Sequence, residues 1–344
     1  MKDKFSFIDI LREDDNESIL KKIKVLQMLS CDRNPEVRIA LARQLVLFDA
    51  DETEKILYEM LFDKNRWVRL EAVDSLSIGY QEKTIEKVKT MVANEGSFIR
   101  AYAVSTLFDL ITNRYGVNSD AYSLYKKCVS AYFIQEKNTR VLFAYYQNNF
   151  FMNNEEGLRL LEHAYMEAVE KSDYKSIWSL LHIFQEILNF KDQMAVRKIV
   201  SYKTEKLLTA QKELVTNIMQ GTIQKKILIV DQNDTYLSHV VLAILDSMRD
   251  SDMEIETAGV NIGIVQEKEI IDFCGRHGMK QKEQYTSKRM INVYSYDYII
   301  CLNSAICKEK YSLCNIICFD ILDVENDCKI IETCHAINQL LKLL

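Results

Sequence analysis

"DRNPEVRIALARQL" (residues 32–45) is the first of three segments that align with one another without gaps. The others are "DKNRWVRLEAVDSL" (63–76) and "NEGSFIRAYAVSTL" (94–107), and each begins 31 residues after the one before. Apolar residues recur in all three at helical spacing, with small residues among them, as in closely packed helices. Amphipathic stretches between them (52–61 and 83–92) predict a second helix in each unit. The sequence therefore predicts a solenoid of paired helices.

Each segment carries an Asp or Asn at its first position and an Arg six residues later (Asp32, Asp63 and Asn94; Arg38, Arg69 and Arg100). The first position is predicted to be a turn or N-cap residue between two helices. The pattern D-x-x-x-x-V-R-x-x-A resembles the second helix of HEAT repeats, over roughly residues 16–112. The resemblance implies that each Arg contacts the Asp of a neighbouring repeat in a structural ladder. Ligand binding by these Arg side chains is the alternative.

Helical periodicity continues to about residue 222 without the regular spacing, which predicts diverged repeats. One face of such a solenoid suits an extended protein or peptide. Aromatic side chains would anchor that partner, and the candidates are Trp67, Phe98, Tyr102, Tyr145, Tyr146 and Trp178. Filling the core between repeats is their alternative role. Bacterial DNA glycosylases with HEAT-like repeats bind DNA on this face, but the net charge of −6 argues against a nucleic-acid partner here.

From residue 225 onward, strand-like and helix-like runs alternate. "KKILIVD" (225–231) is a β-branched run typical of a strand buried on both faces. Three more strands (253–260, 295–303 and 314–323) and three helices (236–248, 267–279 and 329–344) are predicted. This alternation is typical of a small doubly wound α/β domain with a parallel sheet. We therefore expect an α-helical solenoid over residues 1–222 and an α/β domain over residues 223–344.

The α/β segment carries a second family resemblance. "ILIVDQNDTYLSHVVLAIL" (227–245) resembles the first strand, phosphate loop and first helix of the low-molecular-weight protein tyrosine phosphatases and of the arsenate reductases that share their fold. "ETAGV" (256–260) is similar to the end of the next strand of that family. "CGRHGMKQKEQYTSKRMINVYSYDYIICLN" (274–303) is similar to its glycine turn, basic segment and third strand. The resemblance spans about 120 residues and implies a phosphatase-like fold.

The residues that this chemistry needs are replaced. Such an enzyme uses a Cys thiolate as nucleophile and an Arg to hold the phosphoryl oxygens. The resemblance places Asp231 at the nucleophile position, Leu237 at the arginine position and Asp323 at the general acid, whereas Ser238 is kept. Asp234 adds a second negative charge that would repel phosphate. We therefore expect a catalytically inactive domain.

Three roles are open for the acidic residues of this loop. Asp231 and Asp234 would cap N–H groups that bind phosphate in the family, and this is the favoured interpretation. With Asp323 they would otherwise coordinate a divalent cation, or Asp231 would act as an aspartyl nucleophile. No paired His and no Cys-x-x-Cys motif occurs, so we predict no metal and no cofactor.

Composition and charge are those of a soluble protein, with 48% hydrophobic and 27% charged residues. The first residues carry no apolar run, and no stretch reaches the roughly 20 residues of a membrane span. Most of the nine Cys lie in apolar runs and are expected to be reduced core residues. We predict a cytoplasmic, non-enzymatic scaffold that binds a protein or peptide and makes no membrane contact. The C-terminal domain would give a second contact surface or a homodimer interface.

Overall fold

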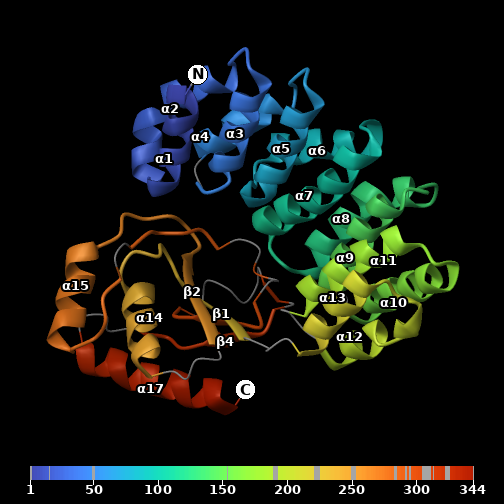
Figure 1. Ribbon diagram of the computed structural model, residues 1–344. Helices are drawn as coiled ribbons and strands as arrows, with labels where there is room; N and C mark the ends of the chain where they lie inside the picture. Colours follow the sequence, from blue (N-terminus) through green and yellow to red (C-terminus); the bar gives the residue numbers. More distant parts are fainter. Residues whose placement is uncertain are drawn as a thin grey trace. The chain divides into compact units, whose positions relative to one another are not determined.

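The computed structural model describes residues 2–14, 16–48, 51–152, 154–188, 193–220, 225–248, 253–282, 285–290, 293, 296–303, 311–312, 314–321 and 326–343. The chain forms two compact units, Met1–Leu161 and Glu162–Leu344 (Figure 1). No helix within the described ranges combines the length and apolar character that crossing a membrane requires.

The first unit consists of helices that pack in two layers. One layer contains α3 (Pro35–Leu45), α5 (Arg66–Ser75), α7 (Ser97–Tyr115) and α9 (Thr139–Met152), each in contact with the next, and α1 (Lys2–Ile10) packs on α3. The other layer contains α2 (Asn16–Ser30), α4 (Asp51–Met60), α6 (Glu82–Asn94) and α8 (Ser119–Phe133). In it, α2 packs on α4 and α6 packs on α8. Short 3₁₀ turns follow α1 (Leu11–Glu13) and α5 (Leu76–Ile78).

The repeated apolar positions form the core between these layers. Val37, Leu41 and Leu45 of α3 are fully buried, and so are the residues that align with them in the second repeat, Val68, Ala72 and Leu76. In α7, Ile99, Ala103 and Leu107 are buried in the same way. The 31-residue register read from the sequence is therefore the register of the fold.

Asn side chains begin the repeat helices, two residues after the aligned Asp. The Asn34 side chain caps α3 by accepting a hydrogen bond from the Glu36 N–H (3.0 Å), and Asn65 caps α5 by accepting one from the Trp67 N–H (2.9 Å). Asp32 and Asp63 form the preceding turns. Pro35 is the first residue of α3, where its missing N–H costs no hydrogen bond.

The second unit starts with helices. Helix α10 (Asn154–Lys171) runs into it from the first unit, and α11 (Tyr174–Ile187), α12 (Gln193–Val200) and α13 (Thr209–Gln220) follow. Helix α11 packs against both α12 and α13. A 3₁₀ turn, Thr204–Lys206, separates α12 from α13.

A four-stranded parallel sheet completes the second unit, as predicted. Its strands are β1 (Lys225–Asp231), β2 (Met253–Gly259), β3 (Tyr298–Cys301) and β4 (Ile316–Cys318), in the order β2-β1-β3-β4. Three helices accompany them: α14 (Leu237–Met248), α15 (Glu267–Arg276) and α17 (Asp327–Leu343). The last helix before the sheet ends at Gln220 and the first strand begins at Lys225, whereas the two compact units divide earlier, after Leu161.

One core joins the three helices to the sheet. Ile227 and Ile229 of β1 are fully buried in it together with Val241 of α14, Phe273 of α15 and Ile337 of α17. Leu228 and Val230, whose side chains alternate to the other face of the sheet, are buried too. Strand β1 is therefore central, and the loop after it rests on a rigid base.

The cysteines depart in one place from the expectation of reduced core residues. Cys128, Cys274 and Cys334 are free and buried, as expected. Cys301, at the end of β3, is disulfide-bonded. Its place in an apolar strand gave no sign of this bond.

Candidate functional site

The loop after β1, residues 231–238, lies where the strand order reverses. Because β1 pairs with β2 on one side and with β3 on the other, the carboxyl end of β1 is the switch point of the sheet. Ligands of parallel α/β sheets bind in the crevice at such points. The loop also leads directly into the N-terminus of α14, whose free N–H groups favour an anion.

The Asp231 carboxylate occupies the position of that anion. Its Oδ1 accepts hydrogen bonds from the N–H groups of Asn233 (3.0 Å) and Asp234, and its Oδ2 accepts one from the N–H of Ser238 (3.1 Å). The side chain is 9% exposed. These contacts are those expected of a carboxylate that caps the loop, and they engage both of its oxygens.

Asp234 is held just as tightly, on the inner side of the loop. Its side chain is fully buried, Oδ1 accepts from the Ser238 hydroxyl (2.7 Å), and Oδ2 accepts from the Lys288 N–H (2.7 Å). Burial raises the pKa of this carboxyl group above its ordinary value, although the charge of nearby His239 acts in the opposite direction. Its backbone has φ of 50°, a left-handed conformation that Asp tolerates better than most residues.

His239 is a buried neighbour that no sequence motif indicated. Its Nε2 lies 3.2 Å from the Asp234 carbonyl oxygen and 3.5 Å from Asp234 Oδ1. Since a carbonyl oxygen only accepts, Nε2 carries the ring proton, and burial lowers the pKa of the imidazole. Nδ1 is buried and makes no hydrogen bond to the described residues. The edge of the ring contacts Tyr285, with the ring centroids 5.7 Å apart.

Two glycines let neighbouring backbone close over the loop. A Cβ on Gly259 would lie 2.4 Å from the Asn261 carbonyl oxygen and 2.7 Å from the Asp234 nitrogen. A Cβ on Gly263 would lie 2.2 Å from the Thr235 side chain. The Ser287 hydroxyl donates to the Asn233 carbonyl (3.0 Å) and accepts from the Gly263 N–H (3.2 Å). The backbone at Gly259 and Gly263 and the Ser287 side chain therefore pack closely against the loop.

Leu237 and Asp323 are the other residues named for this site. Leu237 is the first residue of α14, half-buried against the core. Asp323 lies outside the described residues. Within the part of the chain that is described, no group of three His, Cys, Asp or Glu side chains is placed to hold a metal ion.

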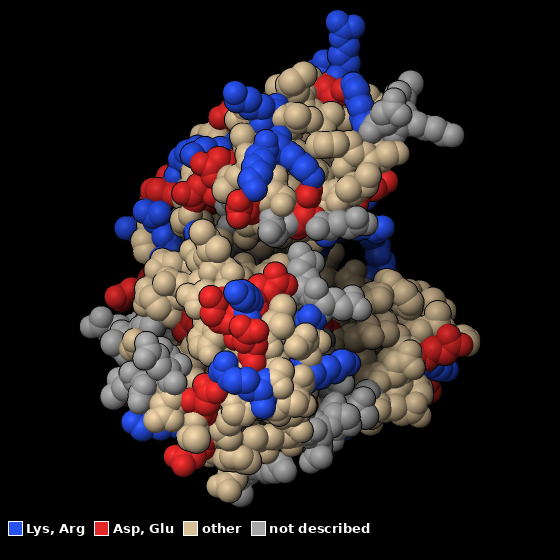
Figure 2. Space-filling model, turned by 90° about the vertical axis from the view of Figure 1, so that its left-hand side faces the viewer, with Lys and Arg blue, Asp and Glu red and all other residues tan. Residues whose placement is uncertain are grey.

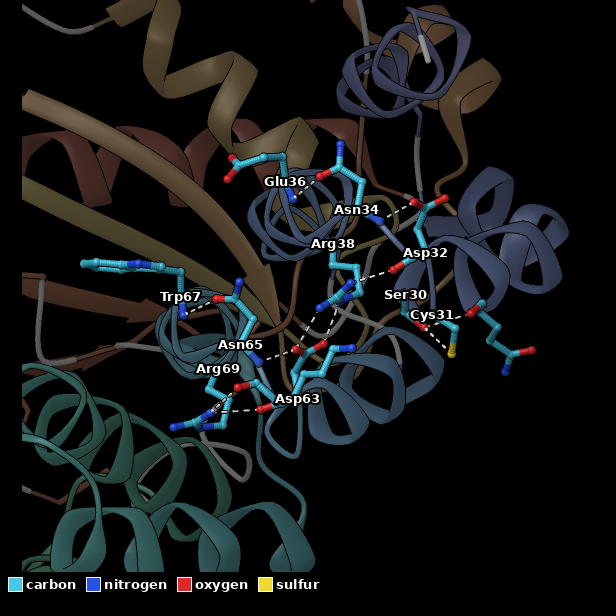
Figure 3. A network of polar contacts seen from close by, with 12 residues as sticks. Ser30, Cys31, Asp32, Asn34, Glu36, Arg38, Asp63, Asn65, Trp67 and Arg69 are labelled. Atoms are coloured by element: carbon cyan, nitrogen blue, oxygen red, sulfur yellow. Dashed lines mark hydrogen bonds and ion pairs between the residues drawn. The ribbon is translucent and has the colours of Figure 1, made fainter.

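The first unit contains a ladder of Arg–carboxylate pairs (Figure 3). Arg38 is buried and binds Asp63 through Nε (2.6 Å) and Nη2 (2.8 Å), while its Nη1 donates to the Asp32 carbonyl oxygen (2.5 Å). The side-chain carboxylate of Asp32 instead pairs with Lys4. The predicted contact with the Asp of the next repeat is thus confirmed for Arg38. Although burial acts in the opposite direction, the hydrogen bond from Arg38 lowers the pKa of Asp63.

The prediction for the third repeat is wrong. Arg69 does not bind Asn94 but Glu95, through Nε (2.9 Å) and Nη2 (3.0 Å), because an amide carries no charge to pair with a guanidinium. The Asn94 side chain donates to the Thr90 carbonyl oxygen instead. Arg100 continues the ladder with Glu136 (2.8 Å). The ladder is structural, and its second and third acceptors are Glu residues outside the aligned Asp position.

A depression of about 490 Å³ lies beside the ladder, between the turn that precedes α3 and the turn that precedes α5. Charged side chains line most of it, including Arg33, Glu59 and Lys64, and Phe62 adds an exposed ring. It is open and charged, unlike the enclosed apolar pockets that take small molecules.

The candidate aromatic residues divide by exposure. Trp67 and Trp178 are 46% and 42% exposed, in the first and second unit respectively. Phe98, Tyr102, Tyr145 and Tyr146 are half-buried. Tyr145 is stacked on Phe133 with ring centroids 4.0 Å apart, which fits the inter-repeat role, whereas Trp67 points away from the ladder in Figure 3.

Trp67, Phe98 and Tyr102 form a continuous row across α5 and α7. The ring centroids of Trp67 and Phe98 are 5.8 Å apart, and those of Phe98 and Tyr102 are 5.7 Å apart. The register of the repeats places Trp67 and Phe98 at aligned positions, 31 residues apart. Among the candidate aromatic residues that the structure describes, Trp67 and Phe98 are the pair that lies one repeat apart and whose rings are in edge-to-face contact.

Comparison with known proteins agrees with the repeat register. The family model of HEAT repeats matches residues 24–107. This segment consists of HEAT repeats. No curated protein matches the chain. Among solved structures, the chain is similar to the thioredoxin-dependent arsenate reductase Cg_ArsC1' of Corynebacterium glutamicum, with 15% sequence identity, a TM-score of 0.30, and coverage of 48% of this chain and 96% of that one.

Surface charge is mixed on the face that Figure 2 displays, where Lys and Arg side chains lie among Asp and Glu side chains. This face lacks the single-sign field that binding to a phosphate backbone uses.

Proposed function

We propose that this chain is a non-enzymatic interaction protein of the cytoplasm. Its HEAT repeats would bind a protein or peptide partner, and its C-terminal domain would be a phosphatase-like fold without phosphatase activity. The observation that carries the second statement is the set of three N–H groups bonded to the Asp231 carboxylate. A phosphate dianion and a carboxylate cannot share these donors.

The same contacts count against Asp231 as a nucleophile. Both of its oxygens accept hydrogen bonds from N–H groups of the loop. Leu237 supplies no charge to hold a phosphoryl group. The half-buried or exposed aromatic side chains of the solenoid support the binding role, because Trp and Tyr dominate the energetics of protein interfaces.

Two measurements test the proposal. Purified full-length protein is assayed on an aryl phosphate, with and without divalent metal ions, beside a tyrosine phosphatase of similar size. We expect turnover no faster than the rate in buffer. Turnover that Asp231→Asn abolishes would make the chain a divergent hydrolase. Affinity capture from a lysate of the native host, with the chain immobilised on beads, is expected to recover a protein that beads without the chain do not retain. Recovery of nucleic acid alone would contradict the binding role.

The C-terminal domain would supply a second contact surface or a homodimer interface. Sedimentation of the full chain over a range of concentrations distinguishes the two roles, since only the dimer depends on protein concentration.

A further inference from the structure

Arg side chains of the first unit differ in what they contact. Arg38, Arg43, Arg69, Arg100 and Arg114 each pair with a carboxylate of the same unit. Arg66 and Arg140 do not pair with any described carboxylate, and lie over aromatic rings instead. In a chain with more acidic than basic residues, these two exposed guanidinium groups, on α5 and α9 with α7 between them, form a distinct surface.

The two guanidinium groups and two rings form one row. The Arg66 Cζ lies 4.7 Å from the centroid of the Trp67 ring, Trp67 contacts Phe98, and the Arg140 Cζ lies 4.3 Å from the Phe98 ring. The row crosses α5, α7 and α9, which are successive helices of one layer. These distances place the two charges within about four or five residues of an extended peptide. We call Arg66, Trp67, Phe98 and Arg140 the arginine–aromatic row.

A guanidinium group that stacks on a ring keeps its N–H edge available. The ring holds the plane of the group and orients it, while its N–H donors remain directed outward for a bidentate bond to a carboxylate. The ring faces add apolar contact area, and Trp and Arg are the residues most often found at binding hot spots. The row thus offers two oriented carboxylate sites joined by an apolar surface.

Acidic residues on the same helix restrict what can bind. Asp74 lies two turns after Trp67 on α5 and is exposed. The Asp74 carboxylate makes no ion pair with a described residue. Glu71 lies between Trp67 and Asp74 on the same face of α5. Burial and, to a smaller extent, the Asp74 charge raise the pKa of Tyr102. A continuous phosphate backbone would meet these negative charges, whereas a peptide can present an acidic residue to each Arg and a neutral or basic one to Asp74.

We infer that the arginine–aromatic row binds a linear acidic segment of the partner protein, with one carboxylate at Arg66 and a second at Arg140. This inference rests on the proposed function and specifies the chemistry of its partner. Apolar side chains between the two acidic residues would lie on Trp67 and Phe98.

Selection from a displayed library of random peptides, with the immobilised full-length protein as target, tests the inference. We expect enriched peptides with two Asp or Glu residues separated by two to four positions. Synthetic enriched peptides should bind Arg66→Gln and Arg140→Gln at least about ten-fold more weakly than the unmodified chain. Lys64→Gln is the matched control, because it removes the same charge two residues from Arg66 at an exposed position, and it should bind within about two-fold.

The outcomes separate this inference from the proposed function. Peptides that bind without acidic residues, or that bind Arg66→Gln and Arg140→Gln as tightly as the control, would overturn the inference and leave a protein-binding solenoid. Failure to enrich any peptide, together with failure to capture a protein from the host, would overturn both. If a single-stranded oligonucleotide binds the unmodified chain tightly and binds the same two variants more weakly, the row binds nucleic acid and the inference is refuted.

Discussion

Removing the Asp231 carboxylate should loosen the loop after β1 and leave an empty anion site. In Asp231→Ala, three N–H groups lose an ionised acceptor, at Asn233, Asp234 and Ser238. A hydrogen bond to a charged group contributes about 1.5–3 kcal/mol, and a buried donor left without a partner costs a similar amount. Since the three bonds share one carboxylate and water can enter at its exposed edge, we expect a total loss of about 3 kcal/mol.

Hydrogen exchange measured along the chain reports this loss where it occurs. About 3 kcal/mol corresponds to roughly a hundred-fold faster exchange of the loop amides, because each 1.4 kcal/mol is ten-fold. The Asp231→Asn side chain keeps one accepting oxygen but turns its amide nitrogen to one of the N–H donors. The exchange rate of its loop amides should therefore lie between that of the unmodified chain and that of Asp231→Ala. Asp272→Ala removes an exposed carboxylate from α15 and should leave loop exchange unchanged.

An added anion distinguishes a filled anion site from an ordinary cap. If the N–H groups form a site that Asp231 fills, then formate or phosphate should slow loop exchange in Asp231→Ala and have no effect on the unmodified chain. An anion present at ten times its dissociation constant restores about 1.4 kcal/mol. Exchange in Asp231→Ala that differs from the unmodified chain by less than three-fold would refute the reasoning. So would an equal response of both proteins to the anion.

Three further results are expected. Urea denaturation should show Arg38→Ala to be about 3 kcal/mol less stable than the unmodified chain, because the variant leaves the Asp63 carboxylate largely buried without its partner. Arg69→Ala should lose only about 1 kcal/mol, because the side chains of that pair are about one-fifth exposed. Equal losses in the two variants would contradict the role of burial. Because burial lowers the pKa of His239 below its ordinary 6.5, the unfolded chain binds a proton that the folded chain does not, so stability should fall as pH falls below 6.5, and His239→Gln should flatten that slope. Exchanging Asp231 for Cys and Leu237 for Arg together should create phosphate binding detectable by titration calorimetry, whereas Leu237→Arg alone should bind no phosphate, because the carboxylate still occupies the site.

The repeat was predictable because its signal is local. Arg38 and Leu45 recur unchanged every 31 residues and the position of Val37 stays apolar, and each occupies in the fold the place that the spacing requires. The acceptors of the ladder were less predictable. The long side chain of Glu95 reaches Arg69 from the position after Asn94, and Glu136 reaches Arg100 from 36 residues away. An ion pair requires only that the two charged groups lie close together, so the sequence position of the acceptor can differ between repeats while the positions of the apolar residues stay the same.

The loop after β1 shows the same limit. Its carboxylates could be read from the sequence, and capping was the favoured role for Asp231 and Asp234. Which donors they use could not be read, because the N–H of Lys288 reaches Asp234 from 54 residues away. His239 was missed for a similar reason: it stands in an apolar helical run, and only the folded chain brings its ring next to the Asp234 backbone.

The identity of the residue at position 231 also decides what the N–H groups of the loop bind. A neutral residue there would leave the N–H groups of a tight loop and a helix N-terminus without an acceptor, and an anion from solution would be attracted to them. Asp supplies the anion from within the chain, at a distance fixed by the backbone. We therefore expect the loop to keep the same conformation with and without phosphate. A surface whose shape does not vary with phosphate concentration is suited to constant contact with a partner, and this is the role that we propose for the domain.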